Sequence, residues 1–121
     1  MEIGHTQKYI HTSPRKLKLV ADMVRSMEPL KAIKILEMTN KAAALSLAKA
    51  IKTAVANARQ QKLPEEGLSF KSLEINSAST RRGVTGRFHA QARGRVSPYK
   101  KRQSHIRIIL SDEGGSNGSK N

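Results

Sequence analysis

The residues with the clearest chemical purpose lie between Arg81 and Arg102, where the sequence reads RRGVTGRFHAQARGRVSPYKKR. This stretch has eight Arg or Lys side chains and no carboxylate, and Arg outnumbers Lys by six to two. A guanidinium group is planar and carries a fork of N–H donors that matches phosphate oxygens. Gly83, Gly86 and Gly94 would let the backbone come close to a ligand. The chemistry that this pattern predicts is the binding of a phosphate polymer.

Aromatic rings lie among these cations, at Phe88, His89 and Tyr99. Such rings can stack on unpaired bases, as they do in many proteins that bind single-stranded RNA. The whole chain has only two Phe and two Tyr residues, so one of each in this segment favours nucleic acid as the partner. The alternative is a disordered basic loop that binds nothing specific. The strands predicted on both sides of the segment argue against that alternative.

No catalytic or metal-binding pattern accompanies the basic segment. The chain has no cysteine and its four histidines are far apart, so neither thiol chemistry nor a Cys/His metal site is expected. His105 lies in the apolar run SHIRIIL and is predicted to be a structural hydrogen-bonding residue. Gly83 and Gly86 are not followed by the Gly-Lys-Ser/Thr of a phosphate-binding loop, and Glu65 beside Glu66 is typical of a solvated pair. We therefore expect no enzyme, no catalytic residue, no metal and no cofactor.

The charge of the whole chain points to the same kind of partner. Its 121 residues have the length of one domain and carry a formal net charge of +14. Such charge repels itself unless a polyanion, either nucleic acid or an anionic membrane surface, neutralises it. No apolar run approaches the roughly 18 residues of a spanning helix, and MEIGHTQKYI at the N-terminus lacks the apolar block of a secretory signal. We expect the protein to remain in the cytoplasm.

Three helices are predicted between residues 13 and 61. A Ser-Pro pair at residues 13–14 is typical of a helix start, because Ser can cap the free amides and Pro fits the first helical position. Apolar residues then recur at helical spacing up to Met27, and a second short helix begins at Pro29. The third helix, about residues 41–61, has the strongest pattern. Its predicted core face consists of Ala44, Leu47, Ala48, Ile51, Val55 and Ala58.

Two of these helices carry cationic stripes. On the first, Arg15, Lys18 and Arg25 share an outer stripe with Asp22. On the third, the stripe is made of Lys41, Lys49, Lys52 and Arg59. A stripe of this kind is either an ordinary solvated face or a surface for nucleic acid, and the pattern leaves both open.

Strands are predicted on both sides of the basic segment. Residues 68–75 have alternating apolar residues with a phase shift between Phe70 and Leu73, which indicates a bulge. A second strand contains alternating Ile106, Ile108 and Leu110, and residues 1–12 are compatible with an edge strand. The simplest closure is a hairpin with its apex near residue 90, about 15 residues a side and on the order of 50 Å long at ~3.3 Å per residue. The polar tail, residues 113–121, is expected to be flexible.

Three blocks of the sequence together resemble a known family. They are SPRKLKLVADMVR (13–25), AVANA in the third helix (54–58) and ARGRVSPYKKRQSHIRIIL (92–110). From about residue 3 to residue 112, the chain resembles the twenty-second family of large-subunit ribosomal proteins. The resemblance implies an α+β fold, in which three helices pack on a small antiparallel sheet and a long β-hairpin arm protrudes. Residues 1–112 would form a single domain, with the arm at about residues 78–101.

The resemblance also implies a function. The protein would be a structural constituent of the large ribosomal subunit that binds large-subunit rRNA, aids its assembly and extends the hairpin to the nascent-peptide exit tunnel. Its partners would be rRNA, neighbouring ribosomal proteins and the nascent peptide near the tip, about residues 84–95, with no membrane and no homo-oligomer. Residues 93–95 match the family's basic-Gly-basic step, and residues 105–106 match its downstream strand motif.

Two features depart from the family pattern. Gln91 lies where a basic residue is usual, and the first side of the arm, residues 75–87, is a few residues longer than in many members. The placement of the tip is the prediction that these departures affect most.

The residues expected to bind RNA form two groups, and most of their contacts should be to phosphate and sugar. Those of the arm are Arg81, Arg82, Arg87, Phe88, His89, Arg93, Gly94, Arg95, Tyr99, Lys100, Lys101 and Arg102. Those of the body are Lys8, His11, Ser13, Arg15, Lys16, Lys18 and Arg25.

The residue pattern alone also allows a histone-like DNA-bending protein, which joins a helical body to basic β-arms and wedges an apolar side chain between base pairs. Phe88 would be the wedge. Against this hypothesis, Pro98 lies partway along one side of the arm, and no strongly apolar face is left for the dimer that such proteins form. A basic peripheral membrane protein would carry large aromatic or Leu residues opposite its charge, where these helices have alanines.

Overall fold

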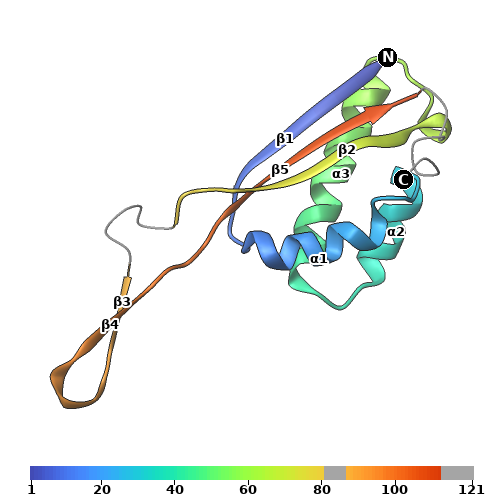
Figure 1. Cartoon of the computed structure of the whole chain (residues 1–121). Helices are drawn as coiled ribbons and strands as arrows, with labels where there is room; N and C mark the ends of the chain where they lie inside the picture. Colours follow the sequence, from blue (N-terminus) through green and yellow to red (C-terminus); the bar gives the residue numbers. More distant parts are fainter. Residues whose placement is uncertain (81–86, 113–121) are drawn as a thin grey trace.

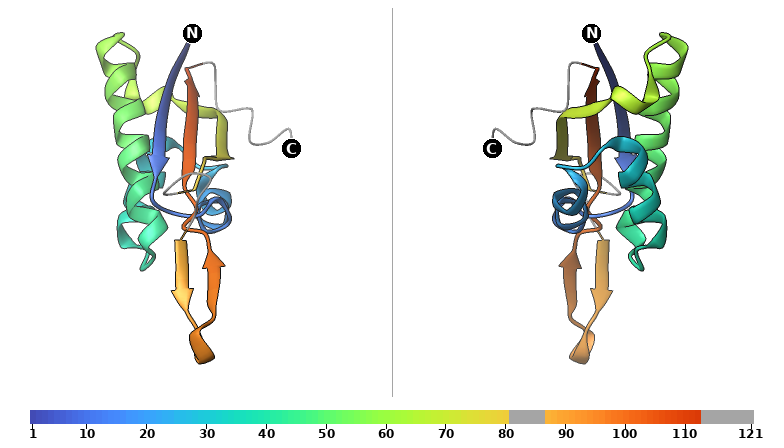
Figure 2. Two further views of the ribbon diagram at one scale, coloured as in Figure 1. Left: turned by 90° about the vertical axis from the view of Figure 1, so that its left-hand side faces the viewer. Right: turned by 90° about the vertical axis from the view of Figure 1, so that its right-hand side faces the viewer.

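The computed structural model describes residues 1–80 and 87–112. Its body is an α+β fold, as predicted, with three helices beside a three-stranded antiparallel sheet (Figure 1). A two-stranded antiparallel ribbon projects from the body as an arm, which is clearest in the two side views of Figure 2. The predictions for Arg81, Arg82, residues 84–86 of the tip and the tail at 113–121 lie outside the described residues.

The sheet has the strand order β1-β5-β2, so the last strand of the chain lies between the first two. The bounds are Glu2–Ile10 for β1, Ser69–Ser77 for β2 and Ser104–Ser111 for β5. In β5, Ile106, Ile108 and Leu110 are fully buried, which confirms the predicted alternation. The N-terminal strand β1 lies at an edge, also as predicted.

The helices form one layer on the core face of this sheet. Their bounds are Pro14–Val24 for α1, Pro29–Met38 for α2 and Ala42–Gln60 for α3. The third helix packs on β1 and β5, the first packs on β2, and both α1 and α2 contact α3.

The first helix starts at Pro14, as predicted, but its capping bond and its end differ from the prediction. Ser13 occupies the cap position, but its side chain makes no capping hydrogen bond. The helix ends at Val24, because the chain then turns and the Met27 N–H donates to the Val24 carbonyl at 3.1 Å. Met27 therefore packs against the core from a turn and not from the helix.

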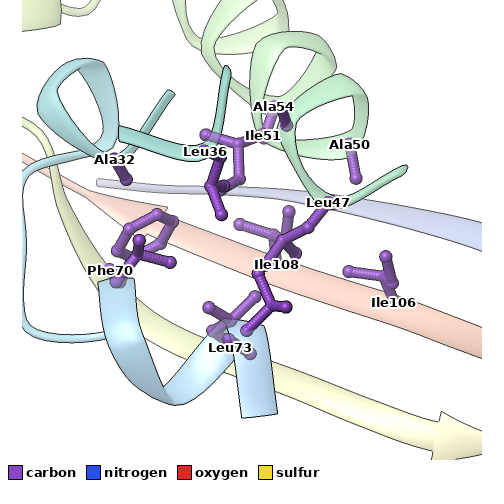
Figure 3. Packing of buried hydrophobic residues seen from close by; sticks show 14 of the residues in the cluster. Ala32, Leu36, Leu47, Ala50, Ile51, Ala54, Phe70, Leu73, Ile106 and Ile108 are labelled. Atoms are coloured by element: carbon purple, nitrogen blue, oxygen red, sulfur yellow. The ribbon is translucent and has the colours of Figure 1, made fainter. Parts of the chain in front are cut away.

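The hydrophobic core lies between the helix layer and the sheet. All six predicted core residues of α3 are buried. Figure 3 shows Leu47 and Ile51 of α3 together with Leu36 of α2 near Ile108 of β5, with Leu73 of β2, the strand partner of Ile108, beside it. The alanines between them have small side chains, which allows α3 to lie close to its neighbours. Since β5 leads directly out of the arm, this core anchors the arm's root.

Two local irregularities shape the sheet. The register of β2 against β5 shifts between Phe70 and Ser72, which confirms the predicted bulge. Near the end of β1, Tyr9 has a φ of 56° and its N–H donates to Nδ1 of His105 at 3.1 Å. The two rings also meet edge to face, with centroids 4.9 Å apart. His105 therefore has the structural role that its place in an apolar strand predicted.

The arm is formed by β3, Arg87–Ala90, and β4, Val96–Tyr99. Nine residues (78–86) connect β2 to β3, whereas four (100–103) connect β4 to β5, so the first side is longer by five. The extra length moves the apex along the sequence. The turn lies at Ala92–Gly94, a few residues beyond the predicted apex near residue 90 and within the predicted tip at about residues 84–95.

Candidate nucleic-acid interface

The tip of the arm is a tight turn that presents two arginines. The Gln91 N–H donates to the Arg95 carbonyl at 2.6 Å, which closes the turn. Within it, Arg93 and Gly94 have left-handed backbones, with φ of 60° and 73°. Glycine adopts this conformation freely, whereas a residue with a side chain loses roughly 1–2 kcal/mol there. Arg93 therefore holds a strained position at the end of the arm farthest from the body (Figure 2).

The ribbon behind the tip has two chemically different faces, which follow from its register. Arg87 pairs with Tyr99 and His89 with Ser97, so these four side chains share one face. The opposite face is wholly apolar and consists of Phe88, Ala90, Val96 and Pro98. Phe88 is 60% exposed and Val96 is 63% exposed. The sequence analysis missed this division, because which residues lie opposite each other depends on the register of the hairpin.

The rings of His89 and Tyr99 stack on each other, with centroids 3.8 Å apart and planes 16° from parallel. Lys101 Nζ lies 5.8 Å from the centroid of the same Tyr99 ring. Two of the three rings that were expected to receive bases are therefore already paired within the arm. Phe88 makes no ring contact within residues 1–80 and 87–112 and is exposed.

At its root, the arm meets the body beside a basic pocket of about 700 Å³. It is lined by His11, Thr12, Ser13, Lys16, Leu19, Lys41, Ala42, Ala43, Lys100, Lys101 and Arg102. Six of the residues predicted to bind RNA are thus brought together from separate parts of the chain. We call this cavity the root pocket.

A second hollow of about 410 Å³ adjoins the root pocket on the other side of the start of α1. Its lining includes Arg15 and Lys18, and it shares Ser13 and Arg102 with the root pocket. The cationic stripe of the first helix is therefore continuous with the root of the arm.

Two predicted RNA-binding residues of the body line neither the root pocket nor the adjoining hollow. Arg25 Nη1 donates to Asp22 at 2.5 Å, and its Nη2 donates to the Leu73 carbonyl at 3.0 Å. These contacts join α1 to β2, so Arg25 has a role inside the body. Lys8 is exposed on β1 and lines neither the root pocket nor the adjoining hollow.

Carboxylates compensate five cationic side chains and the N-terminus on the rest of the body, whereas lysines such as Lys31, Lys34 and Lys62 take part in none of the ion pairs of the described residues. The cation–carboxylate pairs of the described residues there are Met1 N-terminus–Asp112, Arg25–Asp22, Lys52–Glu37, Arg59–Glu65, Lys71–Glu2 and Arg107–Glu74. The hydrogen bond that Arg59 Nε donates to Glu65, and then the negative charge of Glu65, raise the pKa of the Arg59 guanidinium. Lys52 and Arg59 therefore belong to a solvated, paired face. Lys41, from the same predicted stripe, lies instead in the root pocket.

The arm and the root pocket have no such compensation. No carboxylate occurs between Ile75 and Ser111, and none lines the root pocket. None of the ion pairs formed within the described ranges involves a cation of the arm or of the root pocket. Within the described residues, the arm and the root pocket thus form a basic surface that has no carboxylate partner.

Within residues 1–80 and 87–112, no group of three His, Asp or Glu side chains is placed to hold a metal ion. Over those same ranges, no helix has the length and apolarity needed to cross a membrane.

Comparison with known proteins gives a consistent result. A family model described as ribosomal protein L22p/L17e matches residues 5–111. The chain is 37% identical over 114 residues to large ribosomal subunit protein uL22 of Fusobacterium nucleatum subsp. nucleatum, covering 93% of this chain and 99% of that protein. It is 40% identical over 114 residues to the uL22 protein of Leptospira biflexa serovar Patoc, covering 93% and 95%. With the uL22 protein of Staphylococcus aureus it shares 36% identity over 113 residues, covering 93% of each.

Proposed function

The chain belongs to the ribosomal protein L22p/L17e family and is therefore a structural, non-enzymatic protein of the large ribosomal subunit. From this premise we propose that it binds large-subunit rRNA through the arm and the root pocket and aids assembly of the subunit. We further propose that its tip reaches the nascent-peptide exit tunnel.

The observation that carries the rRNA proposal is the separation of charge on the molecule. Every ion pair of the described residues lies on the body outside the root pocket, whereas the cations of the arm and the root pocket face no carboxylate. An isolated two-stranded ribbon is marginal in water, and the apolar face of this one stays exposed because no other element packs on it within the described residues. Phosphate groups around the arm would neutralise its charge and supply the contacts that it lacks.

The strained backbone of Arg93 supports a binding role for the tip. A glycine at this position would form the same left-handed turn at lower free energy. The turn instead contains an arginine, and this turn lies at the end of the arm farthest from the body. Non-glycine residues in strained conformations are concentrated at functional sites, where the side chain is needed.

The mechanism is charge neutralisation combined with shape fitting. Arg93 and Arg95 would bind phosphates at one end of the arm, and the cations of the root pocket would bind phosphates at the other. The exposed ring of Phe88 between them would cover an unpaired base. A rigid body and an arm that contact separate parts of the RNA would hold those parts in one arrangement.

The rRNA proposal is tested by binding of the full-length protein to large-subunit rRNA over a range of salt concentrations. We expect Arg93→Ala together with Arg95→Ala to weaken binding and to flatten the dependence of log K on log salt by about 2, roughly one for each lost phosphate contact. The matched control is Lys52→Ala with Arg59→Ala, which removes the same charge from paired residues. An unchanged salt slope in the arm variant would contradict the assignment of the tip.

The cellular partner is identified by gradient sedimentation of tagged protein from a lysate. Migration with the large subunit that is lost after ribonuclease treatment supports the proposal. Migration with DNA that is released by deoxyribonuclease would favour the histone-like DNA-bending function instead.

The tunnel proposal needs a separate experiment in assembled ribosomes. A photo-crosslinking residue in place of Arg93 should label nascent peptides, whereas the same residue in place of the exposed Leu45 of α3 should not. Labelling of rRNA alone from position 93 would contradict the proposed approach to the nascent peptide.

A further inference from the structure

The root pocket brings together three segments that are distant in the sequence. One wall is formed by residues 11–19, which comprise the loop after β1 and the start of α1. The second is the start of α3, from Lys41 to Ala43, and the third is the root of the arm, from Lys100 to Arg102. A volume of about 700 Å³ lies within the range of clefts that hold drug-sized ligands. It has room for more than one phosphate group.

The charges lining the root pocket are all of one sign. Lys and Arg side chains come from each wall and are Lys16, Lys41, Lys100, Lys101 and Arg102. The lining also includes His11 but neither Asp nor Glu. These cations repel one another in the free protein, and that repulsion is relieved only when an anion enters.

The two helices that begin at the root pocket add to its positive potential. The residues at their cap positions, Ser13 and Lys41, make no side-chain capping hydrogen bond, and neither helix has an acidic residue in its first turn. The first amides of a helix have no partner within the helix, and they carry the positive end of its dipole. At α3, a lysine lies where a capping Ser or Asp is preferred. This arrangement is unfavourable without an anion and favourable with one.

The walls of the root pocket are tied to the central strand of the sheet. The buried Ser104, the first residue of β5, donates from its hydroxyl to the Thr12 carbonyl at 2.5 Å. On the other side of the root, the Ala78 N–H donates to the Gln103 carbonyl at 3.0 Å. The loop after β1 and the root of the arm are therefore held together before any ligand binds. Such preorganisation lowers the entropy lost on binding.

We propose that the root pocket is a phosphate-binding site that takes a turn of RNA backbone and so joins the body to the arm. This inference rests on the proposed rRNA-binding function and deepens it. It assigns Lys41 and the free amides of Ala42 and Ala43 to the RNA interface. It also assigns the site a purpose, which is to fix the direction in which the arm leaves the body once RNA is bound.

The decisive variants replace Lys41 without weakening the fold. Both Lys41→Ser and Lys41→Asp place a preferred capping residue at the start of α3, so neither should destabilise the helix. Lys41→Ser removes one cation, and we expect rRNA affinity to fall about tenfold, the loss of one charge-assisted contact. Lys41→Asp also fills the site with a carboxylate and should weaken binding further. Lys52→Ala is the control, because it removes a cation that Glu37 already neutralises on the same helix.

The outcomes separate this inference from the proposed function. If the unaltered protein binds rRNA and both Lys41 variants bind equally well, the root-pocket site is refuted while rRNA binding stands. If the unaltered protein fails to bind rRNA, the proposed function fails, and titration with inorganic pyrophosphate tests the pocket alone. In that titration, followed by NMR of the full chain, the amide signals of Ala42 and Ala43 should shift in the unaltered protein and not in Lys41→Asp. An absence of shifts in the unaltered protein would refute the site.

Discussion

Two antiparallel strand pairs of this molecule have similar backbones and opposite surroundings. The pair β2–β5 buries Leu73, Ile106 and Ile108 against the helices, and on its outer face Arg107 lies 3.5 Å from Glu74. The pair β3–β4 has no buried residue, and the basic segment around it has no carboxylate. The first pair is stabilised within the chain. The second has the hydrogen-bonding pattern of a sheet but neither the core nor the counter-charges, and its stability has to come from a partner.

The largest expected difference between the two strand pairs is in the rate of amide exchange in the free protein. Opening of β5 requires unfolding of the body, which for domains of this size costs roughly 5–15 kcal/mol. The amides of β3 and β4 are expected to open at almost no cost and to exchange near the unprotected rate. Addition of rRNA should protect them. Slow exchange throughout residues 87–99 in the free protein would contradict the comparison.

Truncation of an apolar residue should have very different consequences in the two pairs. Ile108→Ala is expected to lower the free energy of unfolding by about 2–5 kcal/mol, because it leaves a cavity in the core. Phe88→Ala on the exposed face of the ribbon should change it by less than about 0.5 kcal/mol. Thermal denaturation of both variants measures the difference. A comparable loss in Phe88→Ala would show that the ribbon has a core of its own.

Arg93 at the tip sharpens the comparison. Its left-handed backbone favours glycine, whereas the proposed RNA contact requires the arginine side chain. Arg93→Gly relieves the left-handed strain, yet we expect it to weaken rRNA binding by about 1.5–3 kcal/mol through loss of a charged contact. Arg93→Ala should weaken binding to a similar degree. Binding by Arg93→Gly as tight as that of the unaltered protein would mean that the arginine serves only the turn.

The smallest expected effect concerns the paired charges of the body. Lys52→Ala should lower the free energy of unfolding by about 0.2–1 kcal/mol, since exposed ion pairs contribute little. A double-mutant cycle with Glu37→Ala isolates the pair, and its coupling should vanish in 1 M salt. A coupling that persists at high salt would show that ion pairs contribute more to the stability of the body than the exposure of Lys52 and Glu37 indicates.

Local patterns in the sequence were sufficient for most of the body. The buried face of α3, the alternation in β5 and the bulge in β2 all follow from spacing of apolar residues along one element. The end of α1 was placed too late, because Met27 does reach the core but from a turn. Periodicity reports which residues are buried more reliably than which backbone conformation buries them.

The arm and its root were harder to predict, because their features depend on which distant residues become neighbours. The five additional residues on the first side moved the apex to Ala92–Gly94. The same register made His89 and Tyr99 a stacked pair and left Phe88 on the opposite face. Lys41 was visible only as part of a helical stripe until the fold placed it beside Lys100 and Arg102.

By itself, the sequence determined the charge of this protein, the faces of its elements, its family and the concentration of arginines in one acid-free segment. These properties belong to single residues or to residues within a few positions of each other. The tertiary structure alone decided where that charge is compensated and where it is left open. Counter-ions and pocket walls come from segments up to 111 residues apart, as in the ion pair of the Met1 N-terminus with Asp112, and only the pairing of strands brings such segments together.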